Sequence, residues 1–461
     1  QRLPTGTAGL VSEEDQVDTT AAEGADREGV AARQTALVIV MQVHENDAWA
    51  SPVADRILSK SPLDQQDRNF AANLAFSTLR WEGTLDWVLA NAVSRALEAV
   101  EATLLDLLRI ATWELLHGNQ PVHAVVDSHV EVARVVVGQR ATGFVNGVLR
   151  NIARRIDDLP WPDEATDMGL GLKYGYPSWV AHAAVKRFGD ERAAEVLDAG
   201  NRPAPLVLRA VAPREDVLAA LAAEGIDAEP GTMARDAIVL ADRIQPGRLA
   251  VIRDGLAIVQ DQASQVIGQT AAEGLPAGST AIDLCAAPGG KSTHLAQQGL
   301  QVTAVDRHAG RLRRAAEMAD RLGLEMATVT GDGATVDLPE GVDLVLVDAP
   351  CSGLGVVRRR PELRWRRSRE DVTSMTVVQQ ELLQRAVDLV RPGGRVVYSV
   401  CTWTSDEADD VVAHAVDGGR VTVADVPQVG TPTRFGVQMA PDRDEGDGMY
   451  MAVLERTAEV S

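Results

Sequence analysis

The three cysteines of the chain are the residues best suited to covalent chemistry. Cys285, Cys351 and Cys401 each follow an apolar run that is typical of a buried strand. Because open α/β sheets bind ligands at the carboxyl ends of their strands, the three thiols are predicted to lie at one ligand site. A thiol at such a site can act as a nucleophile, although a cysteine is more often a small buried hydrophobic residue.

The segment around Cys285 has the features of a nucleotide-binding loop. A strand-like run over residues 280–284 leads to a Gly-Gly pair, Gly289 and Gly290, and a helix-like segment follows. Backbone N–H groups at such a helix start can contact a nucleotide. The glycine spacing differs from G-x-G-x-x-G, so an ordinary dinucleotide fingerprint is not the best interpretation.

Two further segments make the pattern specific. Residues 348–353 read Asp-Ala-Pro-Cys-Ser-Gly, and residues 398–402 read Tyr-Ser-Val-Cys-Thr. In this order, after the glycine loop, they resemble the RNA 5-methylcytosine methyltransferases, which use S-adenosylmethionine. The resemblance covers about residues 160–457. It implies a Rossmann-like catalytic domain that binds this cofactor and acts on RNA.

The resemblance also implies a role for each cysteine. Cys401 falls at the position of the nucleophile, and Cys351 at that of the thiol that assists release of the product. Cys285 is expected to be a small buried residue whose backbone lines the cofactor loop. Val400 stands where family members commonly carry threonine before the nucleophile, which is a departure in the local geometry.

The same resemblance implies the residues around the cofactor. Asp306 ends a strand-like run and would bind the ribose hydroxyls, and Asp332 would lie beside the adenine. Asp348 would lie near the methyl donor and the target base. Lys291 either orients Asp348 and the base or is a helix-start lysine bonded to nearby carbonyls. The implied loop contacts are Cys285, Ala286, Ala287, Pro288, Gly289, Gly290 and Lys291, and the implied catalytic set is Cys401, Cys351, Asp348 and Lys291.

Methylation of carbon 5 of cytosine would need two such thiols. Carbon 5 is a poor nucleophile, and addition of a thiolate to carbon 6 makes an enamine whose carbon 5 attacks a sulfonium methyl. The adduct must then lose the carbon 5 proton and expel the thiolate, which requires a second group. Two cysteines at neighbouring strand ends fit this cycle.

Hydrophobic periodicity divides the chain into a tail and three domains. Residues 1–27 are rich in Thr, Gly, Ala and acidic residues and are predicted to be disordered. Residues 28–157 have helical periodicity, and residues 67–70, 121–133 and 144–150 resemble the NusB-like antitermination-factor fold. That resemblance implies an all-helical domain that either docks RNA or merely caps the enzyme.

The remainder of the chain predicts two mixed domains. A Pro-Trp-Pro linker at residues 160–162 opens a small α+β subdomain over residues 160–255, which the resemblance implies contacts RNA. Over residues 256–457, strand-like and helical runs alternate, which predicts a mostly parallel, doubly wound α/β sheet. The strand-like runs cover residues 280–284, 302–306, 342–348, 394–401 and 449–454, and the helical segments between them include residues 311–322 and 377–390.

The composition predicts the cellular compartment of the protein and its classes of partner. Three cysteines without paired spacing indicate a reducing compartment, and no metal site is predicted. No apolar run approaches the ~20 residues that a membrane helix needs, and the start has no basic-then-apolar signal segment. A soluble cytoplasmic protein, without membrane or DNA as a partner and with a monomeric state favoured, is expected.

Charge is unevenly distributed along the sequence. The net charge of −21 argues against nucleic acid as a partner, because phosphate contacts need Lys and Arg. Residues 358–369, however, carry seven arginines against one glutamate, with Trp365 among them. This segment is either a solvated charged face or an RNA-backbone contact, and its position after the Pro-Cys turn favours the second hypothesis.

The order of domains sharpens the expected function. A NusB-like domain, a small subdomain and this catalytic domain together resemble the small-subunit ribosomal RNA cytosine-5 methyltransferases of the Sun/RsmB type. A transfer RNA 5-methylcytosine methyltransferase is the alternative with the same chemistry. A non-catalytic RNA-binding or antitermination protein is the alternative from another class, and the presence of both cysteines with Lys291 and Asp348 argues against it.

Overall fold

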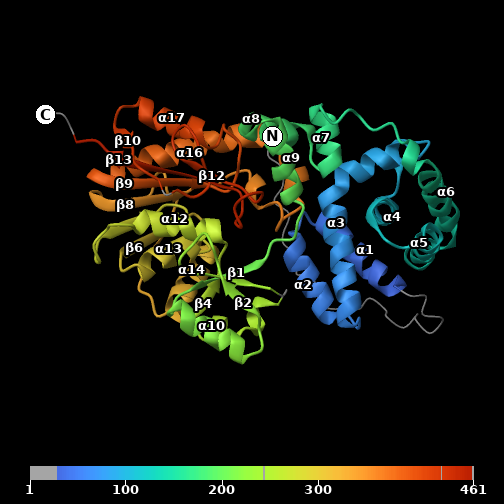
Figure 1. Ribbon diagram of the computed structural model, residues 1–461, viewed down its shortest axis with the longest axis horizontal. Coiled ribbons are helices and arrows are strands. Elements are labelled where there is room, and N and C mark those ends of the chain that lie inside the picture. Colours follow the sequence, from blue (N-terminus) through green and yellow to red (C-terminus); the bar gives the residue numbers. More distant parts are fainter. Residues whose placement is uncertain (1–28, 242–243, 427, 459–461) are drawn as a thin grey trace, which may run out of the picture.

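The computed structural model describes residues 29–241, 244–426 and 428–458, so the tail predicted to be disordered lies outside the described residues. Figure 1 shows an all-helical unit at one end, a doubly wound α/β unit at the other, and a small α+β unit between them. The predicted fold class is therefore confirmed. None of the described helices is long and apolar enough to cross a membrane.

The N-terminal unit is a bundle around one aliphatic core. Leu37, Leu74, Leu107 and Val145 are fully buried in it, because apolar residues recur at helical spacing in each segment. Asp64 caps the longest helix by accepting the Asp67 N–H at 2.8 Å. The helices are α1 (Val30–Glu45), α2 (Ala50–Lys60), α3 (Gln65–Ala90), α4 (Ala102–His117), α5 (Val122–Val136) and α6 (Gln139–Arg155).

The middle of the chain begins with three helices and continues into a small sheet. The helices are α7 (Asp167–Tyr174), α8 (Ser178–Phe188) and α9 (Asp190–Ala199). The sheet is antiparallel in the order β2-β3-β1-β4 and has α10 (Arg214–Ala223) and α11 (Ala250–Arg253) beside it. Its strands are β1 (Leu206–Ala210), β2 (Ala228–Pro230), β3 (Ala237–Leu240) and β4 (Ala257–Val259).

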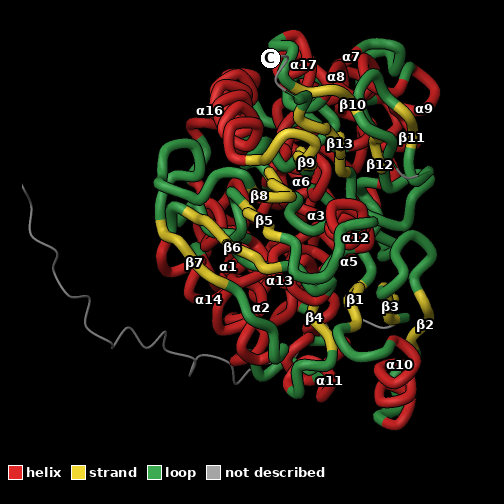
Figure 2. The backbone as a smooth tube through the Cα atoms, turned by 90° about the vertical axis from the view of Figure 1, so that its left-hand side faces the viewer, coloured by secondary structure: helices red, strands yellow, loops and turns green. Residues whose placement is uncertain are grey.

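The C-terminal unit is built on a nine-stranded sheet in the order β11-β12-β13-β9-β8-β5-β6-β7, with β10 paired to β13. Strands β7, β6, β5, β8 and β9 are parallel, and Figure 2 shows them following one another across the molecule. All five predicted strands are present, and β7, β10, β11 and β12 were not predicted. The strands are β5 (Thr280–Asp283), β6 (Gln301–Asp306), β7 (Ala327–Thr330), β8 (Val342–Asp348), β9 (Val390–Val400), β10 (Val421–Val423), β11 (Thr431–Pro432), β12 (Val437–Met439) and β13 (Met449–Arg456).

Helices cover both faces of this sheet. One face packs against α12 (Gln262–Ala272), α13 (Gly290–Gln297) and α14 (Ala309–Arg321), and the other against α16 (Arg369–Leu389) and α17 (Asp409–Asp417). From β5 the chain builds outward through β6 and β7, and it then returns to place β8 and β9 on the other side of β5. The order therefore reverses between β5 and β8, which opens a crevice at their carboxyl ends.

Candidate active site

A pocket of about 410 Å³ lies at the carboxyl ends of β5, β6, β8 and β9. It brings together most of the side chains that the sequence predicted for the site. The predicted residues that line it are Cys285, Ala287, Asp306, Asp332, Asp348, Cys351 and Cys401. The pocket lining does not include the other predicted loop residues, which are Ala286, Pro288, Gly289, Gly290 and Lys291.

Two of the thiols are in direct contact. The Sγ atoms of Cys351 and Cys401 lie 3.2 Å apart, and both side chains are half-buried. The sheet explains this proximity, because β8 and β9 are parallel neighbours whose register sets Asp348 opposite Ser399. The loops that leave the two strands therefore bring the cysteines to one point.

Lys291 reaches the pocket through Asp348. Its Nζ lies 2.7 Å from Asp348 Oδ2, while Ser399 Oγ donates to Asp348 Oδ1 at 2.8 Å. Burial acts to lower the pKa of Lys291, but Asp348, together with the nearby Cys401, raises it above its usual value overall. Of the two alternatives for Lys291, the structure shows the contact with Asp348. The Lys291 ammonium is therefore charged at neutral pH and lies near Cys401.

Glu407 is a residue of the site that the sequence analysis did not predict, and it sets the surroundings of Cys351 apart from those of Cys401. This buried carboxylate accepts hydrogen bonds from Ser352 N at 2.7 Å and from Ser352 Oγ at 2.6 Å, and so holds the residue next to Cys351. The hydrogen bond with Cys401, together with burial and the Glu407 charge, raises the pKa of Cys351 well above its usual range. Cys351 is therefore the thiol that keeps its proton.

The glycine loop is shaped by the helix and strand around it. Gly289 has φ 104°, and a Cβ there would lie 2.7 Å from Ala315 Cβ, so only glycine fits. Arg209 of β1 donates to Gly290 O at 2.5 Å and to Thr293 Oγ1 at 3.0 Å. The small α+β unit thereby fixes the start of α13, a contact that no local sequence pattern signals.

Asp283, at the end of β5, binds the residue that follows the glycine loop. Its Oδ2 accepts the Ser292 hydroxyl at 2.6 Å, and burial raises its pKa to about 7. Burial also raises the pKa of Cys285 far above its usual range, so this thiol is protonated at neutral pH. Cys285 is therefore not a nucleophile in this state.

The residues present fit a sulfonium nucleoside cofactor. Asp306 ends β6 at the pocket wall, and its Oδ1 and Oδ2 accept His308 N at 2.8 Å and Ala287 N at 3.3 Å. Asp332 is exposed at the same pocket. The pocket lining includes carboxylates, the apolar side chains Leu284 and Leu382, and two thiols. The carboxylates can bind hydroxyls, the apolar side chains can contact a base, and the thiols can meet a reacting carbon. Among the residues that the structure describes, there is no group of three or more His, Cys, Asp or Glu side chains placed to hold a metal ion.

The arginine segment over residues 358–369 differs from its predicted role. Arg358 and Arg359 donate to the two oxygens of Asp447 at 3.0 and 2.8 Å, and Arg359 also binds Asp261 at 2.8 Å. Arg364 is fully buried and donates to Gly175 O at 2.9 Å. The chain itself supplies the partners of these guanidinium groups, so the hypothesis that the segment as a whole contacts RNA is wrong. Arg360 and Arg367 still line the pocket.

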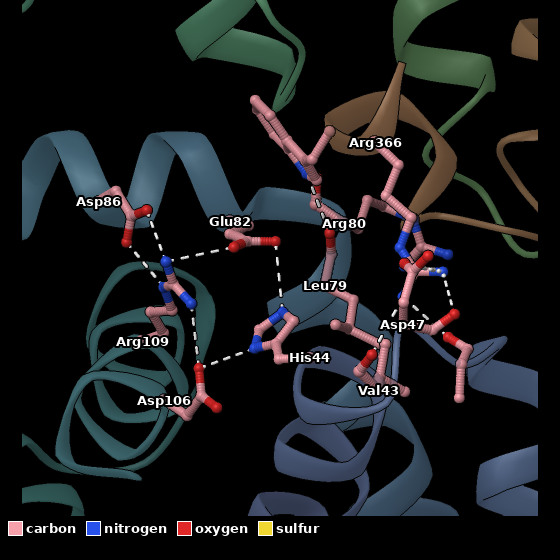
Figure 3. A network of polar contacts seen from close by, with 12 residues as sticks. Val43, His44, Asp47, Leu79, Arg80, Glu82, Asp86, Asp106, Arg109 and Arg366 are labelled. Atoms are coloured by element: carbon pink, nitrogen blue, oxygen red, sulfur yellow. Dashed lines mark hydrogen bonds and ion pairs between the residues drawn. The ribbon is translucent and has the colours of Figure 1, made fainter. Parts of the chain in front are cut away.

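The same segment joins the helical unit to the catalytic unit. Trp365 Nε1 donates to Leu79 O at 3.0 Å, and a Cβ on Gly83 would lie 2.3 Å from the Trp365 ring. Figure 3 shows Arg366 reaching Val43 and Asp47, with Arg366 Nη2 at 3.1 Å from Val43 O. The predicted RNA-binding tryptophan is thus an interdomain contact.

Comparison with known proteins assigns each unit. The model of the 16S rRNA methyltransferase RsmB/F family matches residues 275–455, and that of the NusB family matches residues 30–154. The ferredoxin-like domain of RsmF/B-like methyltransferases matches residues 176–245. The crystal structure of PH0851 superposes with a TM-score of 0.78 at 22% identity, covering 94% of this chain and 99% of that one, which shows a shared fold.

Curated relatives match nearly end to end. The Mycobacterium tuberculosis protein Rv1407 is 38% identical, over 92% of this chain and 96% of its own length. The Escherichia coli protein named ribosomal RNA small subunit methyltransferase B is 30% identical, over 92% of this chain and 98% of its own length. With a NusB-like helical N-terminus, a ferredoxin-like subdomain and a methyltransferase domain in this order, the chain belongs to the RsmB/F family of RNA methyltransferases.

Proposed function

We propose that the protein methylates carbon 5 of a cytosine in small-subunit ribosomal RNA through a covalent adduct with Cys401. The observation that carries this proposal is the 3.2 Å contact between the Cys351 and Cys401 sulfurs in a pocket that Asp306 and Asp348 also line. S-adenosylmethionine, when bound, supplies an electrophilic methyl group. Asp306, Asp332 and the backbone of residues 285–291 would hold it.

Cys401 is assigned as the nucleophile because it lines the open pocket and lies near the Lys291 ammonium. That ammonium would stabilise the thiolate that attacks the base. Addition of the thiolate forms a bond between Sγ and carbon 6 of the cytosine and leaves carbon 5 with the electron density to attack a methyl group. Asp348 holds the ammonium in place through the 2.7 Å contact.

Cys351 is assigned to the release step. After methylation, carbon 5 gives up its proton to solvent water in the open pocket, and the electron pair of that C–H bond re-forms the double bond between carbons 5 and 6. The bond between Sγ and carbon 6 breaks at the same time, and Cys401 leaves with its electron pair as a thiolate. A protonated Cys351 within hydrogen-bond distance of the departing sulfur stabilises it. Glu407 supports this role, because its carboxylate contributes to the raised pKa of Cys351.

RNA would approach the pocket across the basic side chains that line it. Arg307, Arg311, Arg360 and Arg367 line the pocket. Their guanidinium groups suit phosphates on either side of a base that has entered the pocket. We assign residues 28–157 and 160–255 to docking of the RNA and residues 256–457 to catalysis.

Bisulfite sequencing tests the reaction and the substrate together. Ribosomal and transfer RNA would be compared between cells with and without the gene, and a Cys401→Ser gene would serve as the matched control. We expect one cytosine of the small-subunit RNA to resist conversion only when the wild-type gene is present. Protection of a transfer RNA cytosine instead would identify the alternative substrate. No gene-dependent protection in either RNA would contradict cytosine-5 methylation.

A further inference from the structure

Trp49 is the only residue of the helical unit among those that line the catalytic pocket within the described part of the chain. It precedes α2 as the N-cap residue, in the short connection between α1 and α2. Its side chain is 41% exposed, which is unusual for an indole at the junction of two units. Cys351 and Cys401 line the same pocket, about 300 residues away in the sequence.

The backbone on both sides of Trp49 is fixed to the catalytic unit. Arg366 Nη2 donates to Ala48 O at 2.8 Å, and Ala50 N donates to Glu362 Oε1 at 2.9 Å. Both anchors belong to the segment that follows the Cys351 turn, so the indole and the thiol are positioned by one piece of chain. A shift of either unit would move both.

The helix that carries this connection is also held firmly. His44, in the last turn of α1, lies 2.9 Å from Asp106 and 3.5 Å from Glu82 (Figure 3). Burial acts to lower the pKa of His44, but the two carboxylates raise it to about 9, so it is charged at neutral pH. Arg109 binds the same Asp106 at 3.0 Å. The position of Trp49 is therefore set before any RNA arrives.

Two cations lie near the indole. The guanidinium carbons of Arg360 and Arg366 lie 5.0 and 5.6 Å from the Trp49 ring centroid. Arg360 lines the pocket too, so an aromatic surface and a positive charge face the same space. Aromatic side chains flanked by arginine bind single-stranded nucleic acid, because each base can stack on the ring while the cation meets the backbone.

Trp365 shows what a structural tryptophan looks like in this interface. Its Nε1 donates to two backbone carbonyls, Leu79 O and Arg80 O, and its ring packs against Gly83. The Trp49 ring, in contrast, borders an open pocket. The two tryptophans therefore have different tasks at one junction.

We propose that Trp49 is a base-stacking residue that receives a nucleotide beside the target cytosine and so positions the RNA over the two thiols. This inference rests on the proposed function and adds a substrate contact from the helical unit. A cytosine that enters the pocket leaves its neighbours unstacked, and the indole offers one of them a replacement surface. The NusB-like unit thereby contributes directly to the active site.

The test compares Trp49→Ala and Trp49→Phe with the wild type on a small-subunit RNA fragment that contains the target cytosine. Trp161→Ala is the matched control, because Trp161 is 43% exposed but stacks on Trp87 and does not line the pocket. We expect Trp49→Ala to raise the KM for RNA about tenfold. Trp49→Phe should recover most of the loss, and the KM for S-adenosylmethionine should stay unchanged in all variants.

RNA fragments with one abasic nucleotide on either side of the target identify the stacked base. We expect one abasic site to weaken the wild type but not to weaken Trp49→Ala further. An unchanged KM for RNA in Trp49→Ala, or equal losses in wild type and variant at every abasic site, would overturn the inference while leaving wild-type methylation intact. A wild type that methylates no cytosine would overturn the proposed function and this inference with it.

Discussion

The Cys351 turn of the catalytic pocket and the arginine segment over residues 358–369, which forms the interface with the helical unit, lie only a few residues apart in the sequence. Their polar side chains nevertheless differ in what they contact. In the interface, Arg364 is fully buried and donates to Gly175 O and to Asn201 Oδ1 at 2.9 Å each. In the pocket, Cys351 and Cys401 are half-buried and face open space beside Asp348. A charge whose partners all come from the chain contributes to folding, whereas a polar group that borders a pocket stays available to a ligand.

This difference predicts two classes of variant. Substitutions in the pocket should lower the rate of methyl transfer more than the stability of the fold. Substitutions in the interface should do the reverse. A pocket variant that mainly unfolds the protein, or an interface variant that mainly slows the chemistry, would break the comparison.

The largest effect is expected for Lys291→Met. Loss of the ammonium leaves Asp348 without its 2.7 Å partner and the Cys401 thiolate without a neighbouring cation. Methyl transfer should fall about a hundredfold or more. Single-turnover rates measure this change.

Lys291→Arg is the matched control for that prediction. It keeps the positive charge but changes its shape, so it should lose less activity than Lys291→Met. A Lys291→Met enzyme with the wild-type rate of methyl transfer would remove the lysine from the chemistry.

A smaller effect on activity, with a larger one on stability, is expected for Arg364→Met. The substitution leaves the buried acceptors Gly175 O and Asn201 Oδ1 without their donor, which should lower the free energy of unfolding by about 3 kcal/mol. Urea unfolding measures this change, and Arg369→Met, at an exposed site of the same segment, should be nearly neutral. Methyl transfer per folded molecule should stay close to that of the wild type. A slow but fully stable Arg364→Met enzyme contradicts the structural role.

The smallest effect concerns the salt dependence of RNA binding. Arg360 is exposed at the pocket, whereas Arg359 is occupied by Asp447 and Asp261. Arg360→Gln should lower the log–log slope of affinity against salt by about 0.7, the value for one lost contact to single-stranded RNA. Arg359→Gln should give a line parallel to the wild type. A reduced slope in Arg359→Gln would restore the original hypothesis for that residue.

Much of the site followed from sequence because its signals are local. Each cysteine stands at the end of an apolar run, and parallel strands bring such ends to one edge of the sheet. The partners of Arg358 and Arg359 could not be predicted, because Asp261 and Asp447 lie about 90 residues away and a paired arginine reads like a solvated one. Trp49 was missed for the same reason, because only the fold brings it to the cysteines. Glu407 follows Cys401 closely in the sequence, but its contact with Ser352, beside Cys351, spans 55 residues and has no local signal.

Two errors in the fold have different causes. Strand β7 (Ala327–Thr330) is short and mostly exposed, so it lacks the apolar pattern that marks a buried strand. Helix α16 begins at Arg369, eight residues before the expected start at Val377. Its signal was present in the sequence: Ser368 and Asp371 form a capping box, the serine-to-acid spacing that typically opens a helix.

The assignment of separate roles to the two thiols is the central claim, and trapping of the enzyme–RNA adduct tests it most directly. Wild type, Cys351→Ala and Cys401→Ser would each be incubated with S-adenosylmethionine and the RNA fragment, and then resolved by denaturing electrophoresis. We predict that Cys351→Ala accumulates a covalent complex, because Cys401 still attacks but leaves slowly, and that Cys401→Ser forms none. A stable complex with Cys401→Ser and none with Cys351→Ala would contradict the account and make Cys351 the nucleophile.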